Sequence, residues 1–249
     1  MRVIPLLHIK GPNVVKPVHT EALRIVGNPK ELAEKYYKDG ADEIIYLDIV
    51  ASLYRRSFDF ELLKSVSQNI FVPFTVGGGI KSIQDIRNAL RVGADKVAVN
   101  TYALKNPDFL ADAAKVFGSQ CIVLFVEAKK IGENKWEAYT DGGREKTGVD
   151  AVEWIKKAVK IGIGEVLITS IDRDGTKKGY ESELVSAVAS WAPTPVIAHG
   201  GAGSPETVAD VIMKDRADAV AISSSLHYGD FSVNELKKFL FNKGIQVRL

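Results

Sequence analysis

Two residues that can exchange a proton near neutral pH stand at matching places in the chain. His8 lies near the end of the apolar run from Val3 to Ile9, and Glu127 ends the run from Ile122. The stretches IPLLHIK and VLFVEAK align at an offset of 119 residues, which sets His8 against Glu127. A neutral imidazole can accept a proton, and a carboxylate can hold or return one. We therefore predict a catalytic acid–base pair, with a structural role for His8 as the alternative.

Glycine clusters follow two other apolar runs, and each is paired with a polar cluster after the next run along the chain. Glycine lets the backbone approach an anion closely and leaves N–H groups free to bind it. The predicted anion-binding residues are Gly78, Gly79, Asn100 and Thr101 in a first cradle, and Gly200, Gly201, Ser223 and Ser224 in a second. Tight turns alone could explain one such cluster. Two clusters at equivalent positions predict a substrate with a phosphate or similar anion at each end.

Acidic residues after two further runs are candidates for binding substrate hydroxyl or amine groups. The loop SIDRDGT contains Asp172, Asp174 and Gly175, and Asp48 ends the run that begins at Glu43. Such a loop can also be plain solvated surface. We find no spacing of His, Cys and Asp typical of a metal site, and no nucleotide-binding fingerprint. We therefore expect neither a metal nor a nucleotide cofactor.

Eight short apolar runs alternate with amphipathic segments along the whole chain, which is typical of βαβ units and a parallel sheet. The predicted strands are Val3–Ile9, Glu43–Asp48, Phe74–Val76, Lys96–Val99, Ile122–Glu127, Glu165–Thr169, Val196–Ala198 and Ala219–Ile222, and the clearest predicted helices are Pro29–Lys38, Ser82–Val92 and Val149–Lys160. Alternation alone also allows an open doubly wound sheet.

An internal repeat favours a closed barrel. PFTVGGGI from Pro73 matches PVIAHGGAG from Pro195, an offset of 122 residues, and DEIIYLDI from Asp42 matches GEVLITSI from Gly164 at the same offset. Four collinear matches of this kind predict two four-stranded halves related by a pseudo-twofold axis. We predict a single (βα)8 TIM barrel over residues 1–249, an α/β fold with half-barrels of about 1–120 and 121–249.

Composition sets further limits. The chain of 249 residues has a formal charge of +2, so it has no general attraction for nucleic acid or for a membrane surface. Its one cysteine, Cys121, cannot form an internal disulfide. We therefore expect a cytoplasmic protein with no nucleic-acid or membrane partner.

The motifs TVGGGI, GADKVAVNT, GSQCIVL, TSIDRDGT and HGGAG occur in this order, and together they resemble the cyclase subunit of imidazole glycerol phosphate synthase (HisF) from Arg2 to Leu249. The resemblance implies a heterodimer with a glutaminase subunit (HisH-like), which supplies ammonia through the barrel. It also implies that Lys16 helps to hold the substrate phosphate and that Asp95 lies on the docking face.

The same resemblance identifies four charged residues at strand starts with the ammonia gate of the family. They are Arg2, Glu43, Lys96 and Glu165. Alternating charges at the closed end of a barrel could equally be a stability network.

The family's two catalytic aspartates are replaced here by His8 and Glu127. Our leading hypothesis is a cyclase-like lyase subunit of a glutamine amidotransferase complex, diverged toward sugar amidation in surface-glycan biosynthesis with a separate sugar amidotransferase. The first alternative is an active cyclase of histidine biosynthesis, in which a phosphoribulosyl imidazole-carboxamide compound and ammonia give imidazole glycerol phosphate and aminoimidazole carboxamide ribotide. The second is a non-catalytic ammonia conduit.

Overall fold

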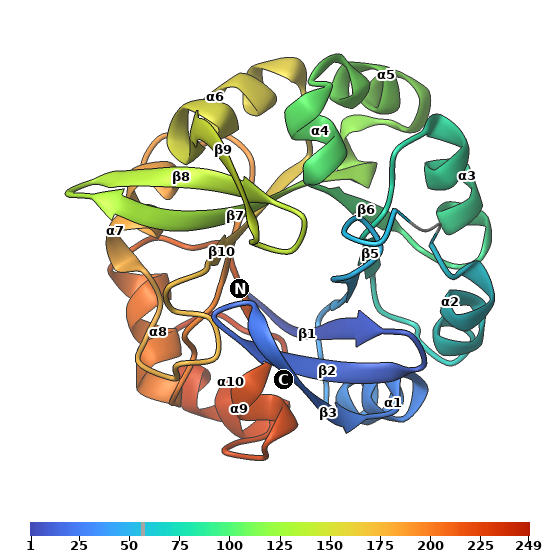
Figure 1. Cartoon of the computed structure of the whole chain (residues 1–249). Helices are drawn as coiled ribbons and strands as arrows, with labels where there is room; N and C mark the ends of the chain where they lie inside the picture. Colours follow the sequence, from blue (N-terminus) through green and yellow to red (C-terminus); the bar gives the residue numbers. More distant parts are fainter. Residues whose placement is uncertain (56–57) are drawn as a thin grey trace.

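Eight parallel strands form a closed ring in the computed structural model, which describes residues 1–55 and 58–249 (Figure 1). The strands, in order around the ring, are β1 (Arg2–Lys10), β4 (Ile44–Asp48), β5 (Phe74–Gly77), β6 (Lys96–Val99), β7 (Ile122–Gly132), β10 (Glu165–Ser170), β11 (Val196–His199) and β12 (Ala219–Ile222). Pairing of β12 with β1 and of β7 with β10 closes the ring. The predicted TIM barrel is confirmed, and the open-sheet alternative is wrong because no strand of the ring has a free edge.

Helices surround the ring and cover its outer face (Figure 1). They are α1 (Pro29–Lys38), α2 (Phe60–Ser67), α3 (Ile83–Arg91), α4 (Thr101–Lys105), α5 (Asp108–Phe117), α6 (Ala151–Ile161), α7 (Ser182–Ala189), α8 (Pro205–Met213), α9 (Ser224–His227) and α10 (Val233–Asn242), with a 3-10 turn at Ser119–Cys121. The three helices predicted from the sequence are present, and two differ slightly in their bounds. Ser204 caps α8 through the Thr207 N–H, with Pro205 at the first helical position, as its sequence indicates.

Two antiparallel hairpins, which we did not predict, extend from the mouth of the barrel. The first, β2 (Asn13–Val18) with β3 (Glu21–Gly27), pairs with β1. The second, β8 (Lys135–Thr140) with β9 (Glu145–Asp150), pairs with β7. Figure 1 shows the two hairpins on different sides of the opening. They extend the strands that carry His8 and Glu127, so each half has one.

The pairing register repeats between the two halves. Ile44 pairs with Phe74 on β4 and β5, and Val166 pairs with Val196 on β10 and β11, so both partners move by the same 122 residues as the sequence repeat. His8 pairs with Leu47, and Glu127 pairs with Thr169 in the same way. His8 and Glu127 therefore occupy equivalent places on strands one and five of the ring, while the half-barrel boundary near residue 120 stays a prediction.

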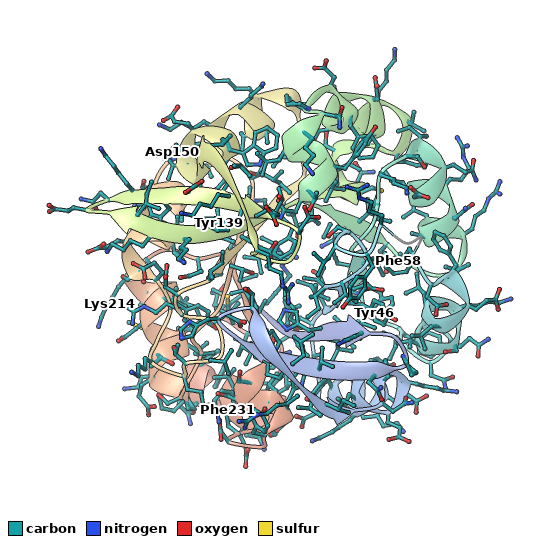
Figure 2. All side chains as sticks on the ribbon, in the orientation of Figure 1. Tyr46, Phe58, Tyr139, Asp150, Lys214 and Phe231 are labelled. Carbon is teal, nitrogen blue, oxygen red and sulfur yellow. The ribbon has the colours of Figure 1, made fainter. Side chains whose placement is uncertain are left out.

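Alternate residues of each strand face the inside of the ring, because side chains on a strand alternate between its two faces. The apolar residues form two separate clusters as a result. The outer one joins Val3 and Leu7 of β1 to the helices. The inner one fills the barrel with Ile4, Leu6, Ile45, Leu47, Ala98, Val123, Leu167, Ile197, Ala219 and Ala221. Figure 2 shows how densely side chains fill the molecule.

None of the helices in the described part of the chain is long and apolar enough to cross a membrane.

A buried ion pair fastens α10 to the closed end of the barrel. Lys237 is 3% exposed, and its Nζ donates to Asp42 Oδ1 and to the Gly40 carbonyl, both at 2.6 Å. The other oxygen of Asp42 accepts from the Val3 N–H of β1 at 2.8 Å. Asp42 thus joins the last helix to the first strand.

Replacing Asp42 with Asn is expected to reduce the free energy of unfolding by about 3 kcal/mol, because it leaves the Lys237 ammonium buried without its counter-charge. Urea denaturation measures the change. Lys237→Met is the matched control and should cost less than half as much, since Asp42 keeps the Val3 N–H and the nearby Arg248. Equal losses in the two variants would contradict this account.

Candidate active site

The residues predicted to bind or convert a substrate gather at the carboxyl ends of the ring strands. On β1, Arg2, Ile4, Leu6 and His8 alternate with outward-facing residues, so His8 shares its inner face with Arg2. The same alternation links Lys96 to Asn100 and Glu165 to Thr169. On β1, β6 and β10 the inner face therefore carries a charged group at the closed end and a polar group at the mouth.

Glu127 is a buried carboxyl group held on two sides. Its Oε2 accepts from Asn100 Nδ2 at 2.9 Å, and Asn100 also donates to the Tyr139 carbonyl of the second hairpin. Burial raises the pKa of Glu127 to about 7, although hydrogen bonds from Asn100 and from the Gly143 N–H act in the opposite direction. At neutral pH this group therefore exists as both acid and base, which general acid–base catalysis requires.

His8 is buried and neutral. Its pKa is held well below the ordinary histidine value, first by burial and then by the positive charge of Lys16 and the neighbouring His199 and His227. Its Nδ1 atom has no hydrogen-bond partner in the described part of the chain. A buried nitrogen without a hydrogen-bond partner is costly, so the side chain of His8 carries an unsatisfied polar atom in this structure.

The first cradle opens into a cavity of about 330 Å³ that reaches Glu127. Its lining includes the predicted residues Asp48, Gly78, Gly79, Asn100 and Thr101. Gly78 has φ +101, and a Cβ there would lie 2.1 Å from the Asp48 carbonyl oxygen, so only glycine fits. This cavity is large enough for a small phosphorylated molecule.

The second cradle is much smaller, with a cavity of about 10 Å³. Its lining contains the predicted residues Asp174, Gly175, Gly200, Gly201, Ser223 and Ser224. Gly201 has φ +108, and a Cβ there would lie 2.1 Å from the Gly179 carbonyl oxygen. The residues are brought together as predicted, but the space has room for about one water molecule.

Lys16 and the first hairpin cover this second cradle. Lys16 is 1% exposed, and its Nζ donates to Asp174 Oδ1 at 2.7 Å. The His19 N–H donates to the Asp174 carbonyl at 3.0 Å, and a Cβ on Gly175 would lie 2.8 Å from the Pro17 carbonyl. Burial lowers the pKa of Lys16, and Asp174 opposes that change. Lys16 and the first hairpin therefore lie directly against the loop that contributes Asp174 and Gly175 to the second cradle.

His199 also lines the second cradle, although it was not among the residues predicted from the sequence. In the repeat it stands where the first half has Gly77, as the register of β5 and β11 shows. A side chain at Gly77 would collide with Leu47 and with the Ala98 carbonyl. A comparison of the repeated motifs HGGAG and GGGI could have identified His199, because the two motifs differ at this inward-facing position.

Arg144 is a second residue that sequence reasoning missed. It lies in the turn of the second hairpin, where its Nη2 donates to the Thr20 carbonyl of the first hairpin at 3.3 Å. Its Nη1 is buried without a hydrogen-bond partner among the described residues. The guanidinium therefore links the two hairpins across the mouth and keeps one donor free.

The four charged residues predicted at the closed end form one network. Arg2 Nη1 donates to Glu43 Oε2 at 2.7 Å and to Glu165 Oε1 at 3.0 Å. Lys96 Nζ donates to the same two carboxylate oxygens at 2.9 and 3.0 Å. Glu43 is fully buried and its other oxygen accepts from Thr75 Oγ1 at 2.6 Å. Alternating charges thus close the barrel beneath its apolar interior.

Two other acidic residues have mainly structural contacts. Asp95 is exposed, and its carboxylate accepts from the Phe74 N–H at 2.8 Å, just as Asp218 accepts from the Val196 N–H in the other half. Asp172 accepts from the Lys130 N–H, outside the mouth, so it does not line the cradle as its place in the loop had suggested. The described residues contain no group of three or more His, Cys, Asp or Glu that could hold a metal ion.

These features define a (βα)8 barrel whose mouth carries the buried residues His8 and Glu127 together with two glycine clusters. A family model described as "Histidine biosynthesis protein" matches residues 2–232. The chain is 48% identical over 248 residues to "Imidazole glycerol phosphate synthase subunit HisF" of Dehalococcoides mccartyi strain BAV1, covering 100% of this chain and 98% of that relative. The same protein of strain CBDB1 matches with the same identity and coverage. The chain belongs to this HisF family.

The raised pKa of Glu127 predicts a specific loss of stability with pH. The group binds its proton more tightly in the folded state, so its contribution is complete below pH 4.5 and is lost as the pH rises toward 7. We expect the stability of the unmodified protein to fall by about 3 kcal/mol relative to Glu127→Gln across that range. Urea unfolding of both proteins at several pH values measures the difference. Parallel pH profiles would show that the carboxyl titrates normally.

Proposed function

We propose that this chain is the synthase subunit that adds ammonia to a bisphosphate substrate and closes the imidazole ring, as in imidazole glycerol phosphate synthase. The observation that carries the proposal is the equivalent position of His8 and Glu127 on strands one and five, with a glycine cluster in each half of the mouth and a charged network at the closed end. The two cradles would hold the two phosphates, so that the reacting centre lies between the pair.

The state of each group suits this chemistry. Glu127, with a pKa of about 7, can give a proton to a departing nitrogen or oxygen and take one from the attacking ammonia. His8 is neutral, so its imidazole could accept a proton or a hydrogen bond from a substrate bound between the cradles. One group on each half of the barrel could therefore serve the two proton transfers of addition and elimination.

The two candidate functions are the cyclase reaction of histidine biosynthesis and surface-sugar amidation, and the names of the relatives favour the first. Both carry the name of the synthase subunit and match over the full length of this chain. This supports the first alternative of our sequence analysis over the leading hypothesis of sugar amidation. Surface-sugar amidation, with a separate sugar amidotransferase, stays the second candidate because His8 and Glu127 stand where the family has aspartates.

Ammonia would enter from a glutaminase subunit bound at the closed end, close to Asp95. Three alanines, Ala98, Ala219 and Ala221, lie in the barrel interior between the charged network and the mouth. Small side chains there favour passage of a small neutral molecule. We propose that Arg2, Glu43, Lys96 and Glu165 gate this route.

The decisive assay combines the purified chain with ammonium salt and the phosphoribulosyl imidazole-carboxamide substrate, and follows loss of substrate absorbance. We expect turnover that falls about 100-fold or more in Glu127→Gln, because the general acid–base group is lost. His8→Gln should reduce kcat as well, since the amide cannot accept a proton.

Lys129→Met, a change of an exposed lysine outside the cradles, is the control and should leave turnover unchanged. Absence of turnover from the folded, unmodified chain would reject the histidine-pathway reaction and favour sugar amidation or the conduit. Binding of a glutaminase would still be expected in both of those cases.

The gate makes a separate prediction for the complex with a glutaminase subunit. Lys96→Met removes one of the two cations between Glu43 and Glu165. We expect the ratio of glutamine-dependent to ammonia-dependent turnover to change several-fold, because only the former needs the internal route. Lys156→Met, on the outer helix α6, should leave the ratio unchanged. An unchanged ratio in Lys96→Met would favour the stability-network interpretation.

A further inference from the structure

A chain of hydrogen bonds leads from the barrel wall into the second cradle through His199. The Thr169 hydroxyl lies 2.8 Å from His199 Nδ1, and His199 Nε2 lies 3.1 Å from the Ser223 hydroxyl. Thr169, His199 and Ser223 are all buried, and they come from the adjacent strands β10 and β11 and from the end of β12. Ser223 lines the second cradle directly.

These two distances are compatible with hydrogen bonds donated in either direction along the chain. A neutral imidazole carries one proton, so it donates at one nitrogen and accepts at the other. If Nδ1 carries the proton, the ring donates to Thr169 and the Ser223 hydroxyl donates to Nε2. If Nε2 carries it, Thr169 donates to the ring, the ring donates to Ser223, and the Ser223 hydrogen is free to point into the cradle.

A phosphate bound in the cradle would stabilise the second arrangement, in which His199 carries its proton on Nε2. A phosphate oxygen is a hydrogen-bond acceptor, so a Ser223 hydroxyl already committed to His199 would turn a lone pair toward it. Burial lowers the pKa of His199 to about 4, and the cradle therefore meets a neutral ring near pH 7. The charged groups nearest to it, Lys16 and Asp174, are paired with each other.

We propose that His199 is a positioning residue that, fixed by Thr169, turns the Ser223 hydroxyl toward a phosphate group in the second cradle. The inference rests on the proposed function in that it takes this cradle to hold a substrate phosphate. The first cradle has no equivalent, because Gly77 occupies the matching position and Asn100, the counterpart of Ser223, donates to Glu127. The two phosphate sites are thus built differently.

Phosphate affinity can be measured at each cradle separately, without turnover. Inorganic phosphate is titrated into the protein labelled with ¹⁵N, and the amide signals of Gly200 and Gly201 report the second cradle while those of Gly78 and Gly79 report the first. The ring ¹⁵N signals of His199 report which nitrogen carries the proton. We expect phosphate to increase the population with the proton on Nε2.

Three variants separate positioning from packing. Gln places its amide nitrogen near the position of Nε2, so His199→Gln should keep the dissociation constant at the second cradle within about twofold. Asn places its amide near Nδ1 and does not reach Ser223, so His199→Asn should bind about five- to tenfold more weakly, as loss of one hydrogen bond predicts. Thr169→Val keeps the shape, removes the donor to Nδ1 and should weaken binding similarly.

The first cradle is the internal control, because its dissociation constant should be unchanged in all three variants, and thermal unfolding verifies that each is folded. Equal phosphate affinity at the second cradle in His199→Gln, His199→Asn and Thr169→Val would overturn the proposal. So would phosphate that shifts Gly78 and Gly79 but leaves Gly200 and Gly201 unmoved. If the unmodified chain shows cyclase turnover but all three variants bind phosphate equally at the second cradle, this inference alone is rejected. If the variants differ in phosphate affinity but the unmodified chain shows no turnover, only the proposed reaction is rejected.

Discussion

The alternation of side chains along the eight ring strands is the constraint on which the rest of the structure depends. Closing the ring forces every second residue of each strand into a narrow interior, where the side chains must fill layers. Along β1 this sequence of layers runs from Arg2 through Ile4 and Leu6 to His8. A shift of one residue would exchange this set with the outer set that packs on the helices. The charged network, the apolar interior and the mouth are therefore positioned by one register.

Charge is distributed unequally along this interior. At the closed end, two carboxylates and two cations neutralise one another. Their attraction opposes the desolvation free energy of Glu43, which is fully buried. At the mouth, Glu127 has no cation bonded to it in the described part of the chain, and its carboxyl group responds to burial by holding its proton more tightly. The same low dielectric thus stabilises an ion network at one end and creates a titratable group at the other.

Most of the site could be predicted from the sequence because its residues stand at strand ends and repeat at a constant offset. Gly78, Gly200, Glu43 and Glu165 lie where the strand pattern and the family resemblance put them. The hairpins could not be predicted in the same way, since their strands carry several polar residues and pair only with each other and with the extended ends of β1 and β7. The ion pair of Lys16 with Asp174 joins residues from distant parts of the chain, and no local pattern reports such a contact.

His8 and Glu127, which the family resemblance sets against two aspartates, acquire a physical meaning from their surroundings. Both replacements reduce negative charge in the central layer, His8 because it is neutral and Glu127 because burial raises its pKa to about 7. A mouth with little fixed charge of its own repels the phosphates of a substrate less than one with two carboxylates. On the proposed function, the buried carboxyl group of Glu127 and the neutral imidazole of His8 then share the proton transfers. His8 and Glu127 therefore give the mouth less negative charge than two aspartates would, and on the proposed function they remain able to exchange protons with a substrate.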